Sequence, residues 1–344
     1  MEKPKLYLHV GSHKTGTSAI QQFCFKNKGT LREQGFFYPT YEPLSNKFKG
    51  GHHSIAHAIA DDSRLLNVDE ATSLVTLWRH FCLRNGCALF VSAEAMYRQT
   101  LGEGKHSERR EKYLERLAEL FNGFDITVLI VFRRPDDYVR SWYQERVKSS
   151  LKKLPDFQAF RNSGLASGVN YSQAAKLFLS NFRDVRGFIY EDLVSSSGNV
   201  VAGFLEQLGI NVDGMERVKT VRKSLSVPQT VVKAYANEFI VNREHSKKFS
   251  KWLKSEKGED LLNQYFAPEQ HYSLWESGEA RRNFIESRSD DLSKLSTLLF
   301  NGRKVLFRDL KLSNKDDVFI GKLPDELKET INKIIDDKRP SSPR

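Results

Sequence analysis

The sequence KLYLHVGSHKTGTSAIQQF, residues 5–23, runs from a short apolar segment into a loop of small and hydroxyl residues, and then into a helix-like stretch. Backbone N–H groups at the start of a helix bind anions, and the helix dipole adds to this. Gly11 and Gly16 let the backbone bend and approach a ligand, and Lys14 adds a full positive charge. The order predicts an anion-binding loop; a glycine-rich turn without a ligand is the alternative.

Strand-like and helix-like segments alternate over the first 210 residues. The continuously apolar ITVLIVF is typical of a strand covered on both faces. The pattern predicts an α/β fold, P-loop-like and three-layered, with a central, mainly parallel sheet and a helical C-terminal extension. The predicted strands are residues 6–10, 87–92, 126–132 and 185–190.

We expect a single core rather than two freely hinged domains, because no strong linker interrupts the 344 residues. Residues 1–210 would form the α/β core. Residues 211–335 would form a helical part of the same domain. Residues 336–344 would be a flexible tail, because their composition is polar and rich in proline and serine.

The net charge of +11 favours anionic partners. Nucleic acid is not expected, because zinc-finger spacing, a long basic arm and an RNA-binding aromatic signature are all missing. Three cysteines without a CxxC pair favour a reducing compartment. With no long apolar run and no signal-peptide pattern, we expect a cytoplasmic location, and leave open peripheral contact with an anionic surface at the inner face of the membrane.

The loop differs from the P-loop of nucleoside-triphosphate enzymes, G-x-x-x-x-G-K-[ST]. Gly11 and Gly16 have the right spacing, but Thr17 stands where the lysine belongs. The lysine of this chain, Lys14, lies inside the loop instead. The position of the lysine in this loop therefore argues against a magnesium-bound triphosphate as the ligand.

A second basic segment, FRRPDDYVRSWY, follows the strand predicted at 126–132. Arg133 and Arg134 stand where a magnesium site would need an acid. Ser141 falls about two turns into the helix that Pro135 begins. Ligands of α/β sheets bind beyond the carboxyl ends of the strands, so an arginine and a hydroxyl here can bracket a second phosphate. Ion pairing on a solvated surface is the alternative.

Three motifs in order, KTGTS, FRRPDDYVRSWY and FIYEDL, resemble the sulfotransferase family. The opening HVGSHKTGTSAIQQF, with GFFYP, is most similar to bacterial members that sulfate carbohydrates, and the resemblance covers about residues 5–195. It implies 3′-phosphoadenosine-5′-phosphosulfate (PAPS) as sulfuryl donor and a hydroxyl of a carbohydrate or glycolipid as acceptor.

The resemblance also implies donor-binding residues. The loop would hold the 5′-phosphosulfate, Arg133 and Ser141 the 3′-phosphate, and Tyr190 would lie near the adenine. Arg222 stands in Arg-Lys-Ser, where members acting on small phenols have Arg-Lys-Gly, so that specificity is not carried over. The full set is Gly11, Ser12, His13, Lys14, Thr15, Gly16, Thr17, Ser18, Arg133, Ser141, Tyr190 and Arg222.

Catalysis is expected without a metal, because cations and helix N–H groups can stabilise a transferring sulfuryl group directly. Lys14 would contact the sulfuryl and bridging oxygens. The general base stays open between His52 and His53, in GGHHSIAHAIA, and Glu94, in FVSAEAMYR. Structural roles are the alternatives for all three. His53 and His57, spaced i and i+4, lack an evident third metal ligand.

Two rival functions belong to other classes. One is a P-loop-like nucleotide kinase or hydrolase, and the other is a non-catalytic protein that binds anionic glycans. Four aromatic residues could stack on sugar rings, although core positions are the more ordinary role for such side chains: Tyr41, Trp142, Tyr143 and Trp275.

Overall fold

The computed structural model describes residues 2–12, 14–163, 169–218, 224–307 and 317–339. The chain divides into two compact units, which are described separately. The sheet unit comprises residues 1–134, 170–221 and 290–308, and the helical unit comprises residues 135–169, 222–289 and 309–344. These bounds interleave along the chain, and the division expected at residue 210 stays a prediction.

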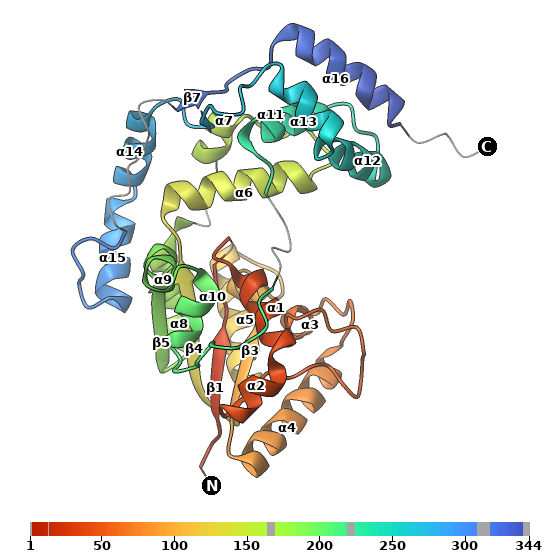
Figure 1. The fold of residues 1–344 in the computed structure, drawn as a ribbon. Helices are drawn as coiled ribbons and strands as arrows, with labels where there is room; N and C mark the ends of the chain where they lie inside the picture. Colours follow the sequence, from red (N-terminus) through yellow and green to blue (C-terminus); the bar gives the residue numbers. More distant parts are fainter. Residues whose placement is uncertain (1, 13, 164–168, 219–223, 308–316, 340–344) are drawn as a thin grey trace. The chain divides into compact units, whose positions relative to one another are not determined.

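The sheet unit holds five strands with helices around them (Figure 1). Its strands are β1 (Lys5–His9), β2 (Phe36–Phe37), β3 (Ala88–Ser92), β4 (Asp125–Phe132) and β5 (Asp184–Ile189). Its helices are α1 (Thr17–Lys26), α2 (Lys28–Glu33), α3 (His53–Ala58), α4 (Val68–Asn85), the short 3-10 helix η1 (Glu94–Tyr97), α5 (His106–Leu120), α8 (Tyr171–Asn181), α9 (Tyr190–Ser197), α10 (Val200–Glu206) and, apart from its first residue, α15 (Ser289–Leu299).

The five strands form one parallel sheet in the order β2-β3-β1-β4-β5. The predicted α/β class with a central parallel sheet is confirmed, and each of the four predicted strands is found within one residue of its expected bounds. The two-residue edge strand β2 was not predicted, because two residues are too short to show a period. Since all strands are parallel, their carboxyl ends meet at one edge, where β1, β3 and β4 lie side by side.

The helix ends of the sheet unit follow ordinary capping rules. Asn67 and Glu70 form a capping box at the start of α4, and Gly86 ends this helix in a left-handed conformation with φ 62°. The helix α1 differs, because Gly16 precedes it without a side-chain cap and its first turn carries no acidic residue. Its N-terminal end is therefore suited to an external anion.

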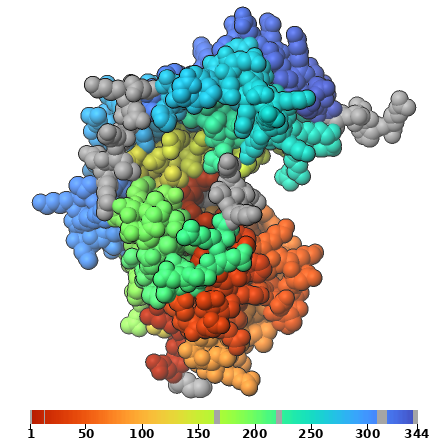
Figure 2. All heavy atoms as spheres, viewed as in Figure 1, coloured from red at the N-terminus to blue at the C-terminus, as the bar shows by residue number. Residues whose placement is uncertain are grey.

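The segment after α10 packs against α1 and α2. Asn211 exchanges two hydrogen bonds with the side chain of Gln34, at 2.8 and 2.9 Å. Glu216 likewise exchanges two backbone hydrogen bonds with the side chain of Asn27, at 2.8 and 3.0 Å. The green segment lies directly against the red helices in Figure 2, so residues 211–216 belong to the same compact body as the loop.

The helical unit has its own core. Its elements are α6 (Pro135–Ser149), α7 (Phe157–Asn162), α11 (Val227–Ala236), α12 (Arg243–Leu253), α13 (Glu256–Asn263), β6 (Tyr272–Ser273), α14 (Gly278–Glu286), β7 (Val318–Phe319) and α16 (Asp325–Asp337). Val232, Phe249, Leu327 and Ile331 are fully buried at the centre of α11, α12 and α16. Most of the described residues of this unit are helical, and the short strand β6 pairs with β7.

Candidate active site at the carboxyl edge of the sheet

The loop after β1 first continues along β4. The amide of Val10 donates to the carbonyl of Leu129 at 3.1 Å, and the amide of Ser12 donates to that of Val131 at 3.3 Å. The Ser12 hydroxyl also donates to the Val131 carbonyl, at 2.7 Å. The first half of the loop is thereby fixed to the sheet before the chain turns into α1.

The turn into α1 uses two left-handed residues. Lys14 has φ 67° and Gly16 has φ 79°. A Cβ atom on Gly16 would lie 2.5 Å from a methyl carbon of Val200 on α10, so only glycine fits there. Lys14 is a non-glycine residue in a region that such residues seldom adopt, and strained backbone of this kind is concentrated at functional sites.

Gly11 leaves room for three polar side chains. A Cβ atom at this position would lie 2.8 Å from Nε2 of His9, 2.8 Å from Oγ1 of Thr17 and 3.4 Å from Oγ1 of Thr15. The Thr15 hydroxyl donates to the Ser12 carbonyl at 2.5 Å. The oxygens of Thr15 and Thr17 are 3.5 Å apart. The loop thus has no space for a side chain at position 11, and the Gly11 backbone lies close to three polar side chains.

Arg133, directly after β4, reaches the same loop. Its NH1 group donates to the carbonyl of Lys14 at 2.8 Å. Its guanidinium lies 4.9 Å from the ring centre of Tyr190, the first residue of α9. The hydroxyl of Tyr171 donates to the Arg133 carbonyl at 2.8 Å. Three predicted donor-binding residues, Lys14, Arg133 and Tyr190, are therefore brought together within the sheet unit.

The other predicted donor-binding residues are placed differently. Ser141 is buried on α6 in the helical unit. His13 and Arg222 lie outside the described residues. Their roles in donor binding stay predictions.

His52, one of the three candidate bases, is fully buried. Its Nε2 donates to the Pro39 carbonyl at 3.1 Å, and its Nδ1 accepts from the Ser92 amide at 3.1 Å. Burial lowers the pKa of His52 to about 3, although these two backbone hydrogen bonds act in the opposite direction. With both ring nitrogens engaged inside the core, His52 is a neutral histidine that joins α3 to β3.

His53 and Glu94, the other two candidates, line one cavity of about 510 Å³. His53 is the first residue of α3, and Glu94 follows β3 in η1. A Cβ atom on Gly51 would lie 2.9 Å from Nε2 of His53 and 2.6 Å from Oε1 of Gln21, so the cavity adjoins α1. The remaining lining residues are His57, Ala95, Arg98, Gln99 and His106.

His57, also on this cavity, contacts two side chains. Its Nδ1 lies 2.8 Å from Nε2 of Gln99 and 3.2 Å from Oδ2 of Asp62. Partial burial lowers the pKa of His57, and Arg64 adds to this effect. Within the described ranges, no group of three or more His, Cys, Asp or Glu residues is arranged to hold a metal ion.

His9 was not among the predicted site residues. It is fully buried at the end of β1, and its Nδ1 lies 2.9 Å from the Ser92 hydroxyl. Burial lowers its pKa to about 3, while the nearby Glu94 carboxylate acts in the opposite direction. The signal in the sequence was a polar residue inside the apolar strand LYLHV, directly before the loop.

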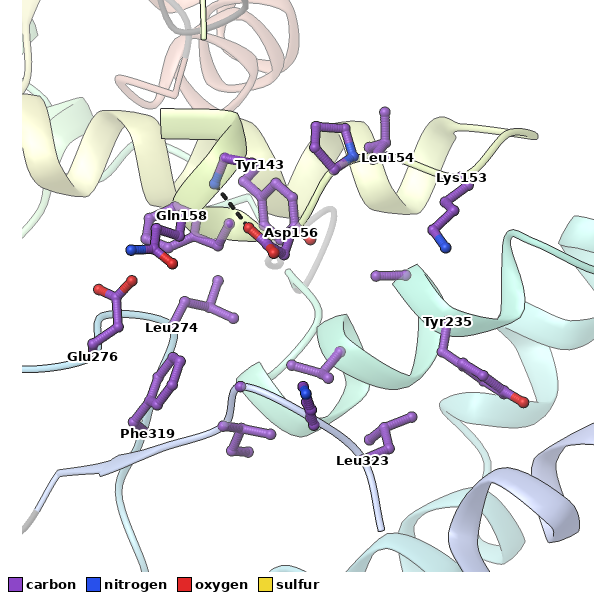
Figure 3. Close-up of a pocket in the computed structure, with 18 of the residues that line it drawn as sticks. Tyr143, Lys153, Leu154, Asp156, Gln158, Tyr235, Leu274, Glu276, Phe319 and Leu323 are labelled. Carbon is purple, nitrogen blue, oxygen red and sulfur yellow. Dashed lines mark hydrogen bonds between the residues drawn. The ribbon is translucent and has the colours of Figure 1, made fainter. Parts of the chain in front are cut away.

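A larger cavity, of about 820 Å³, lies within the helical unit. Leu154, Leu274, Phe319 and Leu323 line it (Figure 3), as does Tyr143, one of the four aromatic residues considered for sugar stacking; none of the predicted catalytic or donor-binding residues lines it. Two ion pairs involve charged groups of its lining: Lys153 with Glu238 at 2.8 Å, and Arg161 with Glu276 at 2.6 Å.

Three of the four aromatic residues considered for sugar stacking are core residues. Tyr41 in the sheet unit, and Tyr143 and Trp275 in the helical unit, are all buried. Trp142 is partly buried against the cluster around Tyr143. None of the helices in the described part of the chain combines the length and apolar character that a membrane span requires.

Comparisons with known proteins add the following. No protein-family model matches the chain, and no curated protein matches it. Among solved structures it is similar to a sulfotransferase from Alicyclobacillus acidocaldarius, with 14% identity, a TM-score of 0.38, and coverage of 70% of this chain and 98% of that one. It is also similar to the sulfotransferase domain from the curacin biosynthetic pathway, with 11% identity, a TM-score of 0.34, and coverage of 84% and 99%. Both are sulfotransferases, the family that the motifs of this chain resemble.

Proposed function

We propose that the chain is a PAPS-dependent sulfotransferase that moves a sulfuryl group to a hydroxyl of a carbohydrate or glycolipid. The observation that carries the proposal is the junction of Lys14, inside the loop, with Arg133, at the end of β4. The Arg133 guanidinium reaches the backbone of the loop that carries Lys14, before the N-terminal end of α1, where an anionic ligand is favoured.

The donor would be held by the loop and the end of β4. Backbone and hydroxyl groups from Gly11 to Ser18 would hold the 5′-phosphosulfate. Arg133 would contact the 3′-phosphate, and the ring of Tyr190 would lie near the adenine. The close packing at Gly11 supports this assignment, because only glycine lets the loop backbone lie against the polar side chains of His9, Thr15 and Thr17. A kinase-like triphosphate site is less well supported, because helix α1 begins with Thr17 where the P-loop places its lysine.

The reaction would be an in-line displacement at sulfur. The acceptor oxygen forms a bond to sulfur as the bond from sulfur to the 5′-phosphate oxygen breaks. The departing adenosine 3′,5′-bisphosphate keeps that electron pair, and the base takes the hydroxyl proton. Lys14 would stabilise the charge that develops on the bridging and sulfuryl oxygens.

The general base is proposed to be His53 or Glu94. Both line the cavity beside α1, whereas His52 is buried with both ring nitrogens engaged. The acceptor would enter that cavity, whose polar lining of histidine, glutamate, arginine and glutamine suits a sugar better than a phenol. The net charge of +11 supports an acidic acceptor or an anionic membrane surface near it, in the cytoplasm.

Calorimetry with adenosine 3′,5′-bisphosphate and with magnesium–ATP tests the donor site. We expect binding of the bisphosphate without metal and weaker binding of ATP. Transfer of ³⁵S-labelled sulfate from PAPS to polysaccharide and lipid-linked sugar extracts then tests the acceptor class.

Each rival function predicts a different outcome. Magnesium-dependent ATP binding tighter than bisphosphate binding would favour a kinase or hydrolase. Binding of acidic glycans with no transfer to any acceptor, although the bisphosphate binds, would favour a non-catalytic glycan-binding protein.

A further inference from the structure

The floor of the donor loop contains one polar atom without a hydrogen-bond partner among the described residues. Nε2 of His9 is buried, and no acceptor or donor lies within hydrogen-bonding distance. The ring is held by Phe204 of α10, whose centre is 4.5 Å away, and by Ser92 at Nδ1. Buried polar atoms are almost always hydrogen-bonded, so an exception beneath a proposed ligand site calls for a functional explanation.

The hydrogen bonds around Ser92 bear on which ring nitrogen of His9 carries the proton. The amide nitrogen of Gln21 donates to the Ser92 hydroxyl oxygen at 3.3 Å and to the Ser92 carbonyl at 3.2 Å. The Ser92 hydroxyl thus accepts from Gln21 and has its own proton to donate. Nδ1 of His9, 2.9 Å away, is one acceptor for this proton, and the hydroxyl of Tyr38 is a second neighbour of Ser92. A neutral imidazole that accepts at Nδ1 carries its proton on Nε2.

The Nε2 atom of His9 lies close to Gly11. The same point, where a Cβ of Gly11 would stand, is 2.8 Å from Nε2 of His9 and 2.8 Å from the Thr17 hydroxyl oxygen. The Thr15 hydroxyl is committed to the Ser12 carbonyl, so Thr15 can only accept from Thr17, across 3.5 Å. Among the described residues, this long contact is the one hydrogen bond found for the hydroxyl of Thr17.

We propose that His9 is a positioning residue of the donor loop: its Nε2–H donates to the hydroxyl oxygen of Thr17 when the Thr17 side chain turns its hydroxyl group to the bound phosphosulfate. The hydrogen bonds then run from Ser92 to His9, from His9 to Thr17 and from Thr17 to the anion, so that His9 and Thr17 each accept one hydrogen bond and donate one. His9 adds no charge, because burial keeps it neutral at any pH above about 3. This inference rests on the proposed function only for the identity of the anion.

Two substitutions at His9 test the contacts of its two ring nitrogens separately. The side-chain amide of glutamine can stand at the position of Nε2, and that of asparagine at the position of Nδ1. His9→Gln should retain the contact to Thr17 and lose Ser92, and His9→Asn should do the reverse. Binding of adenosine 3′,5′-bisphosphate and of inorganic pyrophosphate is measured by calorimetry for both variants and the wild type, with melting temperatures recorded alongside.

We expect His9→Asn to weaken binding of either anion roughly tenfold or more, as for loss of a hydrogen bond near a charged group. His9→Gln should bind within about threefold of the wild type. Two results would overturn the inference: equal binding by wild type and His9→Asn, or losses that follow the melting temperature of each variant rather than the nitrogen removed.

Nitrogen-15 NMR of histidine-labelled protein gives an independent test. The His9 ring should be the Nε2–H tautomer between pH 5 and 8, and its Nε2–H signal should shift when pyrophosphate is added. An Nδ1–H tautomer contradicts the inference. Binding of pyrophosphate but not of the bisphosphate, with the expected His9 results, would leave the inference standing and overturn the proposed donor. Binding of neither anion by the wild type would overturn both.

Discussion

His9, beneath the loop, and His52, at the start of α3, lie on opposite sides of Ser92 and look alike at first. Both are fully buried, and burial lowers the pKa of each to about 3. They differ in the hydrogen bonds of their ring nitrogens. Both nitrogens of His52 are hydrogen-bonded to the protein, whereas only Nδ1 of His9 is. Burial alone therefore does not separate a structural histidine from a functional one, but the hydrogen bonds do.

The same difference distinguishes the two regions around these residues. The start of α3 is closed by aromatic packing, with the rings of Tyr38, Phe48 and Trp78 all within 6 Å of the His52 ring. The loop after β1 instead carries a lysine in the left-handed conformation, a glycine closely surrounded by polar side chains and a helix start without a side-chain cap. Changes in the loop should alter transfer with little effect on stability, and changes at His52 should do the opposite.

The largest effect is expected for Lys14→Ala. Loss of one group that stabilises developing charge costs about 10²–10³ in turnover, and the fold should persist because Lys14 is only partly buried. Labelled-sulfate transfer measures the rate, and circular dichroism measures the fold. Lys47→Ala, at an exposed lysine away from the loop, is the matched control and should transfer like the wild type. If the Lys14→Ala protein keeps normal turnover, Lys14 does not contribute to catalysis, and the functional contrast between the loop and the region around His52 is wrong.

The next effect concerns the two remaining candidate bases. Glu94→Gln and His53→Gln keep the size and polarity of the side chains but remove the basic group. The variant that lacks the base should lose roughly 10²-fold or more in kcat, together with the corresponding limb of the pH–rate profile. Glu115→Gln, on the exposed face of α5, is the control. If neither variant slows transfer, the cavity next to α1 is not where the acceptor proton is removed.

Much of the sheet unit could be predicted from the sequence, because buried parallel strands leave continuous apolar segments. The segment ITVLIVF gave β4 to within one residue. The loop and Arg133 could also be predicted, since glycine spacing and strand-end charges are local signals. The role of His52 could not, because its partners Pro39 and Ser92 are 13 and 40 residues away. His9 was missed for the same reason: the Ser92 hydroxyl is 83 residues distant.

A smaller effect, on stability alone, is expected for His52→Leu. The substitution leaves the Ser92 amide and the Pro39 carbonyl unpaired in the core, which costs about 2–5 kcal/mol of the free energy of unfolding. Hydrogen exchange of the β3 amides measures this for the sheet unit itself. His80→Leu, at an exposed position of α4, is the control. Transfer per folded molecule should stay within about twofold, and a large loss of transfer without a loss of stability would make His52 functional after all.

The smallest effect is a pH dependence that the two histidines share. For each, the pKa is 6.5 in the reference state and about 3 in the folded protein. Below pH 6.5 the unfolded chain binds a proton at each residue that the folded chain does not bind. The free energy of unfolding should therefore fall as the pH falls from 6.5 towards 3, by about 1.4 kcal/mol per pH unit and histidine once the pH is well below 6.5.

Urea unfolding at pH 5.0, 5.5, 6.0 and 7.5 at constant ionic strength measures this slope, in a range where most carboxylates stay ionised. The slope reports how many more protons the unfolded chain binds than the folded one. Replacing His52 by leucine should lower this number by close to one between pH 5 and 6, and replacing His9 should lower it by the same amount. Equal reductions would show that the residues are alike in burial, so that any difference in anion binding must come from the ring nitrogens. If only one replacement changes the slope, the other histidine is charged in the folded protein, and the parallel between them fails.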